Sequence, residues 1–323
     1  VGMPEHYIAF WNLENLFDVD RSPGRPEWLQ RQLRSELAGW DEAVLGRKIS
    51  QLASIIGQMN GGLGPDVLGV CELENRSVVT RLANTLASRG RQYAVAHHDT
   101  SDQRGIDVAF LYDPDRFTAE ETFSHVILKR TATRDIFQVN LHGTNGKDLI
   151  VVGNHWPARS GGVFESEPYR MTAGETLSYW MERILEIKGS NAAVLVMGDF
   201  NDQPYDRSIQ EYAQATYLTQ RVVGARLPRL LNLMWPFYGQ GLGTYYFDNF
   251  PLIFDQFLAS RGLLNGGGGF HVRPESTEIL MFPEMRATGT YPVPRRFSRP
   301  SEFGFNPDGY SDHYPIGVRV SEV

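Results

Sequence analysis

The chain has 323 residues, of which 41% are hydrophobic and 12% aromatic, and its formal net charge at pH 7 is −7. This is enough apolar material for a large core, and no apolar run approaches the roughly 18 residues that a membrane span needs, so we expect a soluble protein, cytoplasmic or secreted after removal of a signal peptide. The acidic balance disfavours a broadly basic nucleic-acid-binding face, and the single cysteine, Cys71, excludes an internal disulfide.

Strand-like and helix-like segments follow one another along the whole chain. Short apolar runs predict strands near residues 6–12, 67–72, 93–97, 108–112, 136–142, 149–155, 193–199, 252–260 and 316–320. Apolar residues at helical spacing predict helices near residues 41–59, 76–89 and 169–188. This mixture favours an α/β fold, a four-layer sandwich of two mixed β-sheets packed face to face with helices outside, built as a single domain from residues 1–323.

Polar residues gather at the ends of these apolar runs. In chain order they are Asn12, Glu14, Glu72, Asn154, His155, Asp199 and Asn201, and Asp312 and His313 precede the last strand. One strand-terminal acid is usually a solvated turn residue, and Gly198-Asp199-Phe200-Asn201 alone is as readily an Asx turn, in which the glycine lets the backbone turn at the strand end. The repetition of this pattern indicates one polar cleft at the strand ends.

Six motifs, in a fixed order, carry a resemblance to a known superfamily. They are Phe10-Trp11-Asn12-Leu13-Glu14-Asn15-Leu16, Gly69-Val70-Cys71-Glu72-Leu73-Glu74-Asn75, Gly153-Asn154-His155-Trp156-Pro157, Gly198-Asp199-Phe200-Asn201, Phe254-Asp255-Gln256 and Ser311-Asp312-His313. The chain resembles the endonuclease/exonuclease/phosphatase superfamily from Phe10 to Pro315, and it looks closest to uncharacterised bacterial members. The resemblance implies the same four-layer sandwich and a metal-dependent phosphoesterase activity.

The resemblance also implies a metal site in which Glu72 is the principal ligand, with Asn12, Glu14 and Asp312 around it or around a second ion. Mg²⁺ prefers oxygen ligands and keeps several waters, so one or two carboxylates and a substrate phosphate suffice to hold it. The chain has neither a His-Glu-x-x-His helix nor a second cysteine, which disfavours a dedicated zinc site. We therefore expect Mg²⁺ or Mn²⁺ as the cofactor.

For catalysis, the resemblance implies that Asp199 and Asn201 hold water and phosphate, that His155 and His313 contact phosphoryl oxygens, and that Asp255 orients His313. The chemistry of these groups agrees. A carboxylate can orient or deprotonate water, and a neighbouring amide can donate to a phosphoryl oxygen. An imidazole that donates one ring nitrogen to a carboxylate is fixed in its tautomer and easier to protonate, so its other nitrogen can donate to phosphate.

Four further residues are candidates for substrate contact. Arg159 and Arg170 follow the histidine motif, and an arginine fork can bind phosphate through two hydrogen bonds. Arg296 lies shortly before the final motif, where nearby acidic residues make a solvated face almost as good an interpretation. Trp235 lies in the aromatic segment 226–250, which is a lid, a base-stacking surface, a lipid-facing patch or, equally, an irregular loop folded onto its own core.

These features predict a Mg²⁺- or Mn²⁺-dependent phosphoesterase that hydrolyses phosphodiester bonds, with a nucleic-acid endonuclease as the first interpretation. One alternative is a phosphatase or phosphodiesterase acting on a small or lipid-derived substrate, as a sphingomyelinase does. Another is a non-catalytic binding module with the same fold, although such modules usually lose metal ligands or the final histidine, which this chain keeps. The sequence indicates no obligate protein partner.

Overall fold

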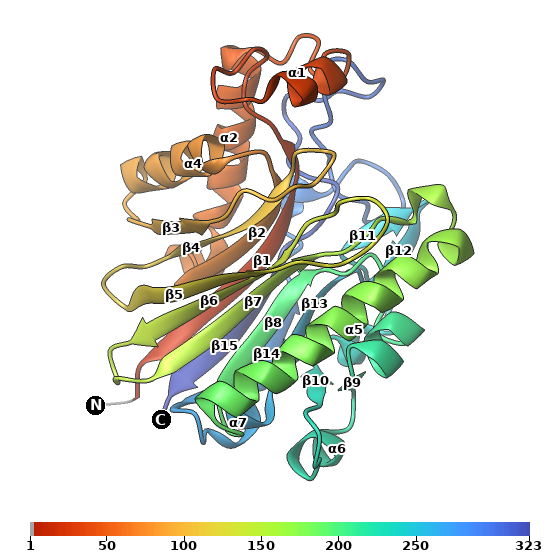
Figure 1. Cartoon of the computed structure of the whole chain (residues 1–323). Coiled ribbons are helices and arrows are strands. Elements are labelled where there is room, and N and C mark those ends of the chain that lie inside the picture. Colours follow the sequence, from red (N-terminus) through yellow and green to blue (C-terminus); the bar gives the residue numbers. More distant parts are fainter. Residues whose placement is uncertain (1–2) are drawn as a thin grey trace.

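The structure, a computed structural model, describes residues 3–323 and contains two large β-sheets with helices on their outer faces (Figure 1). The six-stranded sheet contains, in spatial order, β14 (Phe270–Ile279), β15 (Ile316–Glu322), β1 (Glu5–Leu16), β2 (Val67–Leu73), β4 (Asp107–Tyr112) and β3 (Ala94–His97). The seven-stranded sheet contains β5 (Phe117–His125), β6 (Ile136–Gly143), β7 (Asp148–His155), β8 (Ala193–Asp199), β13 (Asp255–Ala259), β10 (Leu230–Asn232) and β9 (Ala215–Thr216). Both sheets are mixed, as predicted, because β1–β2 and β7–β8 are parallel and most other pairs are antiparallel.

The helices and one small hairpin complete the fold. The helices are α1 (Glu27–Leu33), α2 (Glu42–Ile56), α3 (Met59–Gly62), α4 (Arg76–Ser88), α5 (Val163–Lys188), α6 (Thr219–Val223) and α7 (Arg261–Asn265). The hairpin pairs β11 (Tyr245–Phe247) with β12 (Phe250–Leu252). Among the described residues, no helix combines the length and hydropathy that crossing a bilayer requires.

Three apolar layers hold the sandwich together. Side chains alternate along a strand, so Phe10 of β1 enters the layer between the sheets while Trp11 enters the layer under α2 and α4. In β8, Leu195 likewise faces the other sheet, whereas Val196 packs against Leu177 of α5. The two sheets therefore pack face to face with helices outside.

The structure corrects several predicted boundaries. The strand expected at residues 252–260 is divided into β12 and β13, and the edge strands β5 and β14 were not predicted, because both expose polar side chains and show no buried periodicity. The helix predicted to begin near Pro168 begins at Val163 and continues through the proline. Pro168 is the sixth residue of α5, so its missing N–H removes one backbone hydrogen bond, to the carbonyl oxygen of Phe164, while the helix continues.

Gly198 has a different role from the one predicted. It lies inside β8 instead of turning the backbone at the strand end. A Cβ atom at this position would lie 2.3 Å from the backbone oxygen of Asn154 in β7. Only glycine allows the two parallel strands to approach this closely beside the polar cluster.

Candidate active site

Backbone pairing brings the predicted polar residues to one edge of the sandwich. The parallel pairs β1–β2 and β7–β8 have their carboxyl ends together, which places Asn12 beside the residue that precedes Glu72 and places His155 opposite Asp199. β13 runs antiparallel to β8, and its first residue, Asp255, pairs with Asp199. Residues far apart in sequence therefore meet because of strand order and register.

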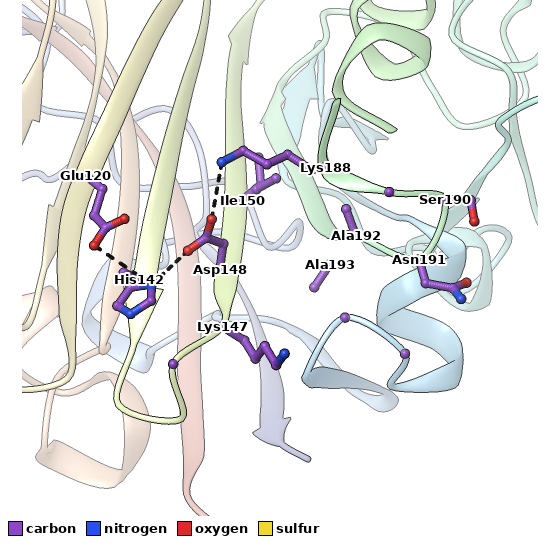
Figure 2. A pocket seen from close by; sticks show the side chains of 14 residues that line it. Glu120, His142, Lys147, Asp148, Ile150, Lys188, Ser190, Asn191, Ala192 and Ala193 are labelled. Carbon is purple, nitrogen blue, oxygen red and sulfur yellow. Dashed lines mark hydrogen bonds and ion pairs between the residues drawn. The ribbon is translucent and has the colours of Figure 1, made fainter. Parts of the chain in front are cut away.

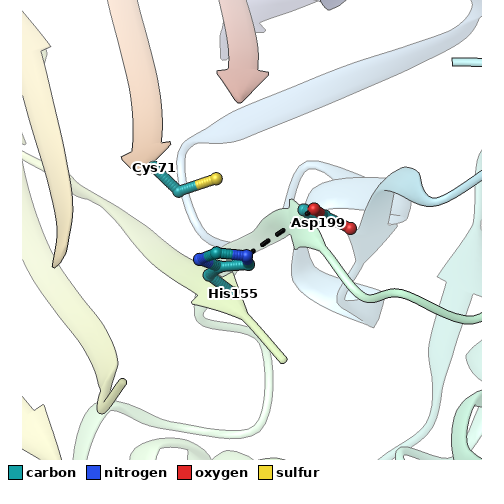
Figure 3. Close-up of side chains that lie close together, drawn as sticks. All are labelled: Cys71, His155 and Asp199. Carbon is teal, nitrogen blue, oxygen red and sulfur yellow. Dashed lines mark ion pairs between the residues drawn. The ribbon is translucent and has the colours of Figure 1, made fainter. Parts of the chain in front are cut away.

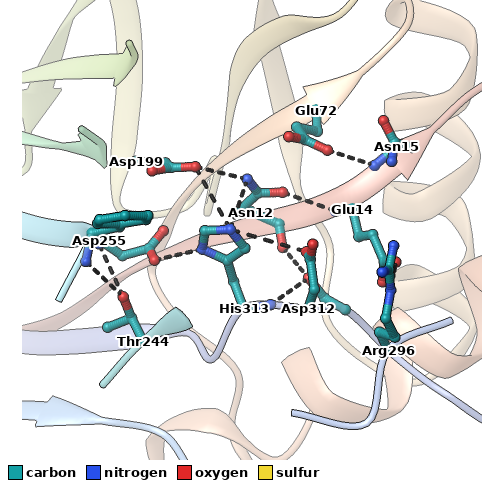
Figure 4. Close-up of polar contacts among 12 residues, drawn as sticks. Asn12, Glu14, Asn15, Glu72, Asp199, Thr244, Asp255, Arg296, Asp312 and His313 are labelled. Atoms are coloured by element: carbon teal, nitrogen blue, oxygen red, sulfur yellow. Dashed lines mark hydrogen bonds and ion pairs between the residues drawn. The ribbon is translucent and has the colours of Figure 1, made fainter. Parts of the chain in front are cut away.

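Unusual backbone conformations occur in the same place. Glu14, Glu72 and Asn201 have φ angles of 52°, 61° and 49°, in the left-handed region that non-glycine residues rarely occupy. The pairing of β1 with β2 and of β2 with β4 is irregular here. Such irregularities redirect the side chains that follow them and are common next to active sites. Glu72 turns toward the polar cluster at this irregularity (Figure 4).

His313 and Asp255 form the pair that the sequence predicted, with 2.6 Å between His313 Nδ1 and Asp255 Oδ2 (Figure 4). Asp255 is fully buried, and its backbone N–H donates to the hydroxyl of Thr244 at 3.0 Å. The indole of Trp11 donates to the backbone carbonyl oxygen of His313 at 2.9 Å. The ring is thus held through Nδ1 and the backbone of His313 through its carbonyl oxygen, while Nε2 lies 3.7 Å from Oδ2 of Asp199.

The two histidines of the cluster prefer opposite charge states. Burial alone would lower the pKa of His313, but the negative charges of Asp255 and Asp199 outweigh it and hold that pKa well above its usual value. Burial lowers the pKa of His155 well below its usual value, and the positive charge of Arg134 lowers it further. Near neutral pH, His313 is therefore an imidazolium and His155 a neutral imidazole.

Asp199 lies between these two rings. Its Oδ2 accepts a hydrogen bond from the side-chain amide of Asn12 at 3.0 Å and lies 3.7 Å from Nε2 of each histidine. Its Oδ1 accepts from the backbone N–H of Asn201 at 3.0 Å, and the Asn201 side-chain amide donates to the carbonyl oxygen of Trp156. Burial raises the pKa of Asp199 to about 6, while the charge of His313 acts in the other direction. Near neutral pH most of Asp199 is a carboxylate that can accept a proton.

Cys71 lies at the edge of this cluster (Figure 3). Ligand atoms of Cys71, His155 and Asp199 lie within 4.8 Å of one another. Burial, together with the negative charges of Asp199 and Glu72, raises the pKa of the Cys71 thiol well above its usual value. The thiol stays protonated, so Cys71 is a small buried apolar neighbour of the site and is not set up as a nucleophile.

Glu72 and Asp312 are the carboxylates best placed to hold a cation. Glu72 accepts from the backbone N–H of Asn15 at 2.9 Å, and its side chain is partly exposed. Burial and the negative charges of Glu14 and Glu72 raise the pKa of Asp312 to about 7. Burial would raise the pKa of Glu72, but the positive charges of Arg104 and His313 hold that pKa below its usual value, so Glu72 is an anion near neutral pH. Carboxylate groups of this kind suit the oxygen donor set of a divalent cation, so these residues fit the expected metal.

Glu14 differs from its predicted role as a metal ligand. It is buried, and its carboxylate accepts from Nε of Arg296 at 2.8 Å and from the backbone N–H groups of Phe297 and Ser298 at 3.1 and 3.0 Å. Both oxygens are therefore used to anchor the segment that leads to Asp312. Arg296 is half exposed but pairs with Glu14, so its predicted contact with substrate is reduced to the part of the guanidinium that remains free.

Arg170 and Arg159 also differ from the predicted phosphate-binding pair. Arg170 is fully buried, with its Nε 2.7 Å from Oδ1 of Asp202, so it cannot touch a substrate and instead supports the fold. Arg159 is partly exposed and pairs with Asp202 at 2.8 Å and Asp206 at 2.7 Å. Its Nε donates to the backbone oxygen of Asn201 at 2.7 Å, which positions that residue from behind.

Trp235 belongs to a row of four aromatic rings. It lies in the short helix η3 (Trp235–Phe237), and its ring centroid lies 4.9 Å from that of Tyr217 and 5.9 Å from that of Tyr238. Tyr238 in turn contacts Tyr205 at 5.2 Å. The three tyrosines are exposed, and Trp235 and Tyr217 line a groove of about 480 Å³. The row leaves the base-stacking prediction for Trp235 open.

Two residues of the cluster were not predicted. Arg104, on the loop before β4, has Nη1 4.0 Å from Oε1 of Glu72 and donates through Nη2 to the side-chain oxygen of Asn15 at 2.8 Å. The ring of Tyr245 lies 4.9 Å from that of His313. Arg104 stands in no motif, and Tyr245 is one aromatic residue among many in the segment 226–250, so neither had a distinctive sequence signal.

A second cavity, of about 610 Å³, lies at the opposite ends of β7 and β8 (Figure 2). His142 Nδ1 lies 2.9 Å from Oδ1 of Asp148 there, and Lys188 Nζ lies 3.5 Å from Oδ2 of the same carboxylate. These charged groups neutralise one another. The cavity therefore has fewer unpaired charged groups that could bind a phosphoester than the cluster around Asp199 has.

Comparison with known families gives a match to the endonuclease/exonuclease/phosphatase family over residues 7–322. Among solved structures, a protein of that family from Bacteroides thetaiotaomicron is 14% identical, with a TM-score of 0.58 and coverage of 100% of both chains. The human Nocturnin catalytic domain with bound sulfate is 16% identical, with a TM-score of 0.57 and coverage of 99% of this chain and 94% of that one. A Bacteroides thetaiotaomicron mannosyl-6-phosphatase is 16% identical, with a TM-score of 0.56 and coverage of 98% and 99%. At these identities the structures share the fold alone, and a comparison with curated proteins finds no match.

Proposed function

The chain belongs to the endonuclease/exonuclease/phosphatase family of metal-dependent phosphoesterases, and we propose that it hydrolyses phosphodiester bonds, with nucleic acid as its substrate. The observation that carries this proposal is the arrangement of His313, charged and fixed by Asp255, across the cluster from the carboxylate of Asp199. A proton donor and a proton acceptor thus face the same space. Hydrolysis of a phosphoester uses a donor that stabilises the negative charge growing on the phosphoryl group and an acceptor that takes a proton from the attacking water.

Each group has a defined part in this proposal. The Asp199 carboxylate orients and deprotonates the attacking water, and Asn12 holds that carboxylate through its 3.0 Å hydrogen bond. The imidazolium of His313 donates from Nε2 to the phosphoryl group, where negative charge grows as the bond to the leaving oxygen breaks. His155, which is neutral, offers a hydrogen bond without adding a second positive charge.

Glu72 and Asp312, with Asn12 beside them, are the residues that would hold a divalent cation, which we propose is Mg²⁺ or Mn²⁺. When bound, such a cation neutralises phosphoryl oxygens and polarises the phosphorus. Arg104, near Glu72, adds a donor on the same side of the cluster. The remaining residues act on water and on protons.

Few cationic side chains of the cluster remain available for a substrate phosphate. Arg159 is paired with two aspartates, and Arg296 is paired with Glu14. His313 and Arg104 are then the cationic side chains with capacity for substrate. The choice of nucleic acid rests on the aromatic row that includes Trp235, whose three exposed tyrosines offer surfaces on which bases can stack.

A small or lipid-derived phosphoester is the second candidate. The arginines of the cleft are mostly neutralised within the chain, and the net charge is −7, so the affinity for a long polyanion rests on few free cations. A compact substrate needs none of these additional contacts. The mannosyl-6-phosphatase that shares the fold is one such enzyme.

The test is a substrate panel with Mg²⁺, Mn²⁺ or Ca²⁺, in which the wild-type chain is compared with His313→Ala. The panel contains plasmid DNA, single-stranded RNA, abasic duplex, sphingomyelin, inositol phosphates, mannose 6-phosphate and bis(p-nitrophenyl) phosphate. We expect metal-dependent cleavage of nucleic acid and of the chromogenic diester, lost in the variant. Release of inorganic phosphate from the monoesters, with every diester intact, would contradict the proposal.

A further inference from the structure

Tyr245, the first residue of β11, is tied to the catalytic segment through the backbone. It forms an isolated antiparallel bridge with His313, and the N–H of Tyr314 donates to the carbonyl oxygen of Thr244 at 2.8 Å. The hydroxyl of Thr244 accepts from the N–H groups of Phe254 and Asp255 at 3.1 and 3.0 Å. The start of the hairpin therefore holds both halves of the His313 and Asp255 pair.

The Tyr245 ring packs against two other rings. Its centroid lies 5.3 Å from that of Phe254, with 12° between the planes, and the guanidinium of Arg159 lies over Phe254 at 4.9 Å. Its centroid also lies 4.9 Å from that of His313, with a tilt of 37°. These contacts hold the Tyr245 ring beside the imidazole.

The hydroxyl of Tyr245 lies within electrostatic reach of the charged groups of the polar cluster. Among residues 3–323 no hydrogen bond of this hydroxyl is found, and the residue is partly exposed. Burial and the nearby charge of Asp312 raise the pKa of Tyr245 to about 12, so the group remains protonated at neutral pH. The other charges that act on it belong to Arg296, Asp199 and Glu72, which are all groups of the same cleft.

We propose that the Tyr245 hydroxyl is a second hydrogen-bond donor for the substrate phosphoryl group, next to His313, and that the Tyr245 ring positions the imidazole. This inference rests on the proposed phosphoesterase site and adds a substrate contact to it. Two donors side by side, the Tyr245 hydroxyl and His313 Nε2, suit an oxyanion with two oxygens on that side, as in a phosphate. The stack from Arg159 to His313 keeps both donors in place.

Two substitutions separate the hydroxyl from the ring. Tyr245→Phe removes the hydroxyl and keeps the stack, whereas Tyr245→Leu removes both. The matched control is Tyr246→Phe, because Tyr246 faces the core on the other side of β11, where its hydroxyl accepts from the N–H of Gly243 at 3.3 Å. Each variant is compared with the wild-type chain in three measurements, which are the affinity for inorganic phosphate in the presence of Mg²⁺, kcat and KM for bis(p-nitrophenyl) phosphate, and the ¹H–¹⁵N spectrum of the His313 ring.

We expect Tyr245→Phe to weaken phosphate binding roughly 10- to 100-fold, the effect of one hydrogen bond to a charged group, and to leave the His313 ring signals in place. Tyr245→Leu should weaken binding at least as much and also shift those signals, because the adjacent aromatic ring is gone. Tyr246→Phe should leave binding and signals unchanged.

Phosphate affinity that is the same in Tyr245→Phe and in the wild-type chain would overturn the inference, even if the enzyme cleaves diesters normally. If the wild-type chain cleaves no phosphoester but Tyr245→Phe still weakens phosphate binding, the proposed function fails and the contact stands. A wild-type chain that binds no phosphate overturns the inference, and one that also cleaves no phosphoester overturns both. Unshifted His313 signals in a folded Tyr245→Leu variant would remove the positioning role.

Discussion

Replacing Lys48 by methionine should change how the stability of the protein depends on pH. Lys48 lies in α2 and is fully buried, with its ammonium donating to the carbonyl oxygen of Tyr310 at 2.6 Å and lying 5.0 Å from the centre of the Phe297 ring. Burial lowers the pKa of Lys48 to about 8, although the negative charges of Glu14 and Asp312 raise it in part. Methionine has a similar shape and no charge to bury.

The magnitude follows from proton linkage. The pKa of an unperturbed lysine is 10.5, whereas that of Lys48 in the folded protein is about 8. This difference in pKa corresponds to a free-energy cost of about 3 kcal/mol for burying the charged form. Below the folded pKa both states carry the proton, so folding bears the whole penalty of burying the charge. As the pH rises through 8 toward 10.5, the folded protein loses its proton first and the penalty decreases. Between pH 7 and pH 9.5, we expect the wild-type chain to gain about 2 kcal/mol relative to Lys48→Met.

Urea denaturation at pH 7 and pH 9.5, in the presence of a chelator, measures this difference. Subtracting the free energies of unfolding of the two proteins removes the contributions of tyrosines and other groups that titrate in both. Lys147→Met is the matched control, because Lys147 is exposed and its substitution should give a difference that does not vary with pH. A difference between wild type and Lys48→Met that is constant to within about 0.5 kcal/mol would refute the assigned pKa and the reasoning built on it.

Three further predictions concern the site. Glu72→Gln should reduce the Mg²⁺-dependent rate by at least roughly 100-fold with an unchanged circular dichroism spectrum, and a normal rate at saturating Mg²⁺ would exclude Glu72 as the principal ligand. His313→Ala should lower kcat by roughly two to four decades. Adding Asp255→Asn to this variant should lower kcat little further, because an orienting residue has no separate role once the imidazole is gone. Full additivity of the two single effects in steady-state kinetics would contradict the proposed pair. Arg104→Ala should raise KM roughly 10- to 100-fold with kcat nearly constant, as loss of a charged hydrogen bond to bound phosphate predicts, and an unchanged KM would place Arg104 outside the substrate site.

Much of the fold and of the catalytic pair could be predicted because local pattern and motif order carry them. The apolar runs that lead into Asn12, Glu72, His155 and Asp199 lie in the buried strands β1, β2, β7 and β8, and such runs are recognisable without a structure. The edge strands β5 and β14 were not predicted. Each has one neighbouring strand and many solvent-exposed side chains, so its sequence shows no continuous apolar run.

What the tertiary structure decided is which polar groups remain free to act. The sequence predicted that Arg170 contacts substrate and that Glu14 binds the metal, but both side chains are paired within the chain. Arg170 pairs with Asp202, and the Glu14 carboxylate accepts from Arg296 and from two backbone N–H groups. Conversely, Tyr245 is brought to the site only by its bridge to His313, which is 68 residues away in sequence. A motif specifies the type of side chain at a strand end. Burial, charge state and hydrogen-bond capacity depend on what the folded chain places around that side chain, because these interactions act over a few ångströms in space and not along the sequence.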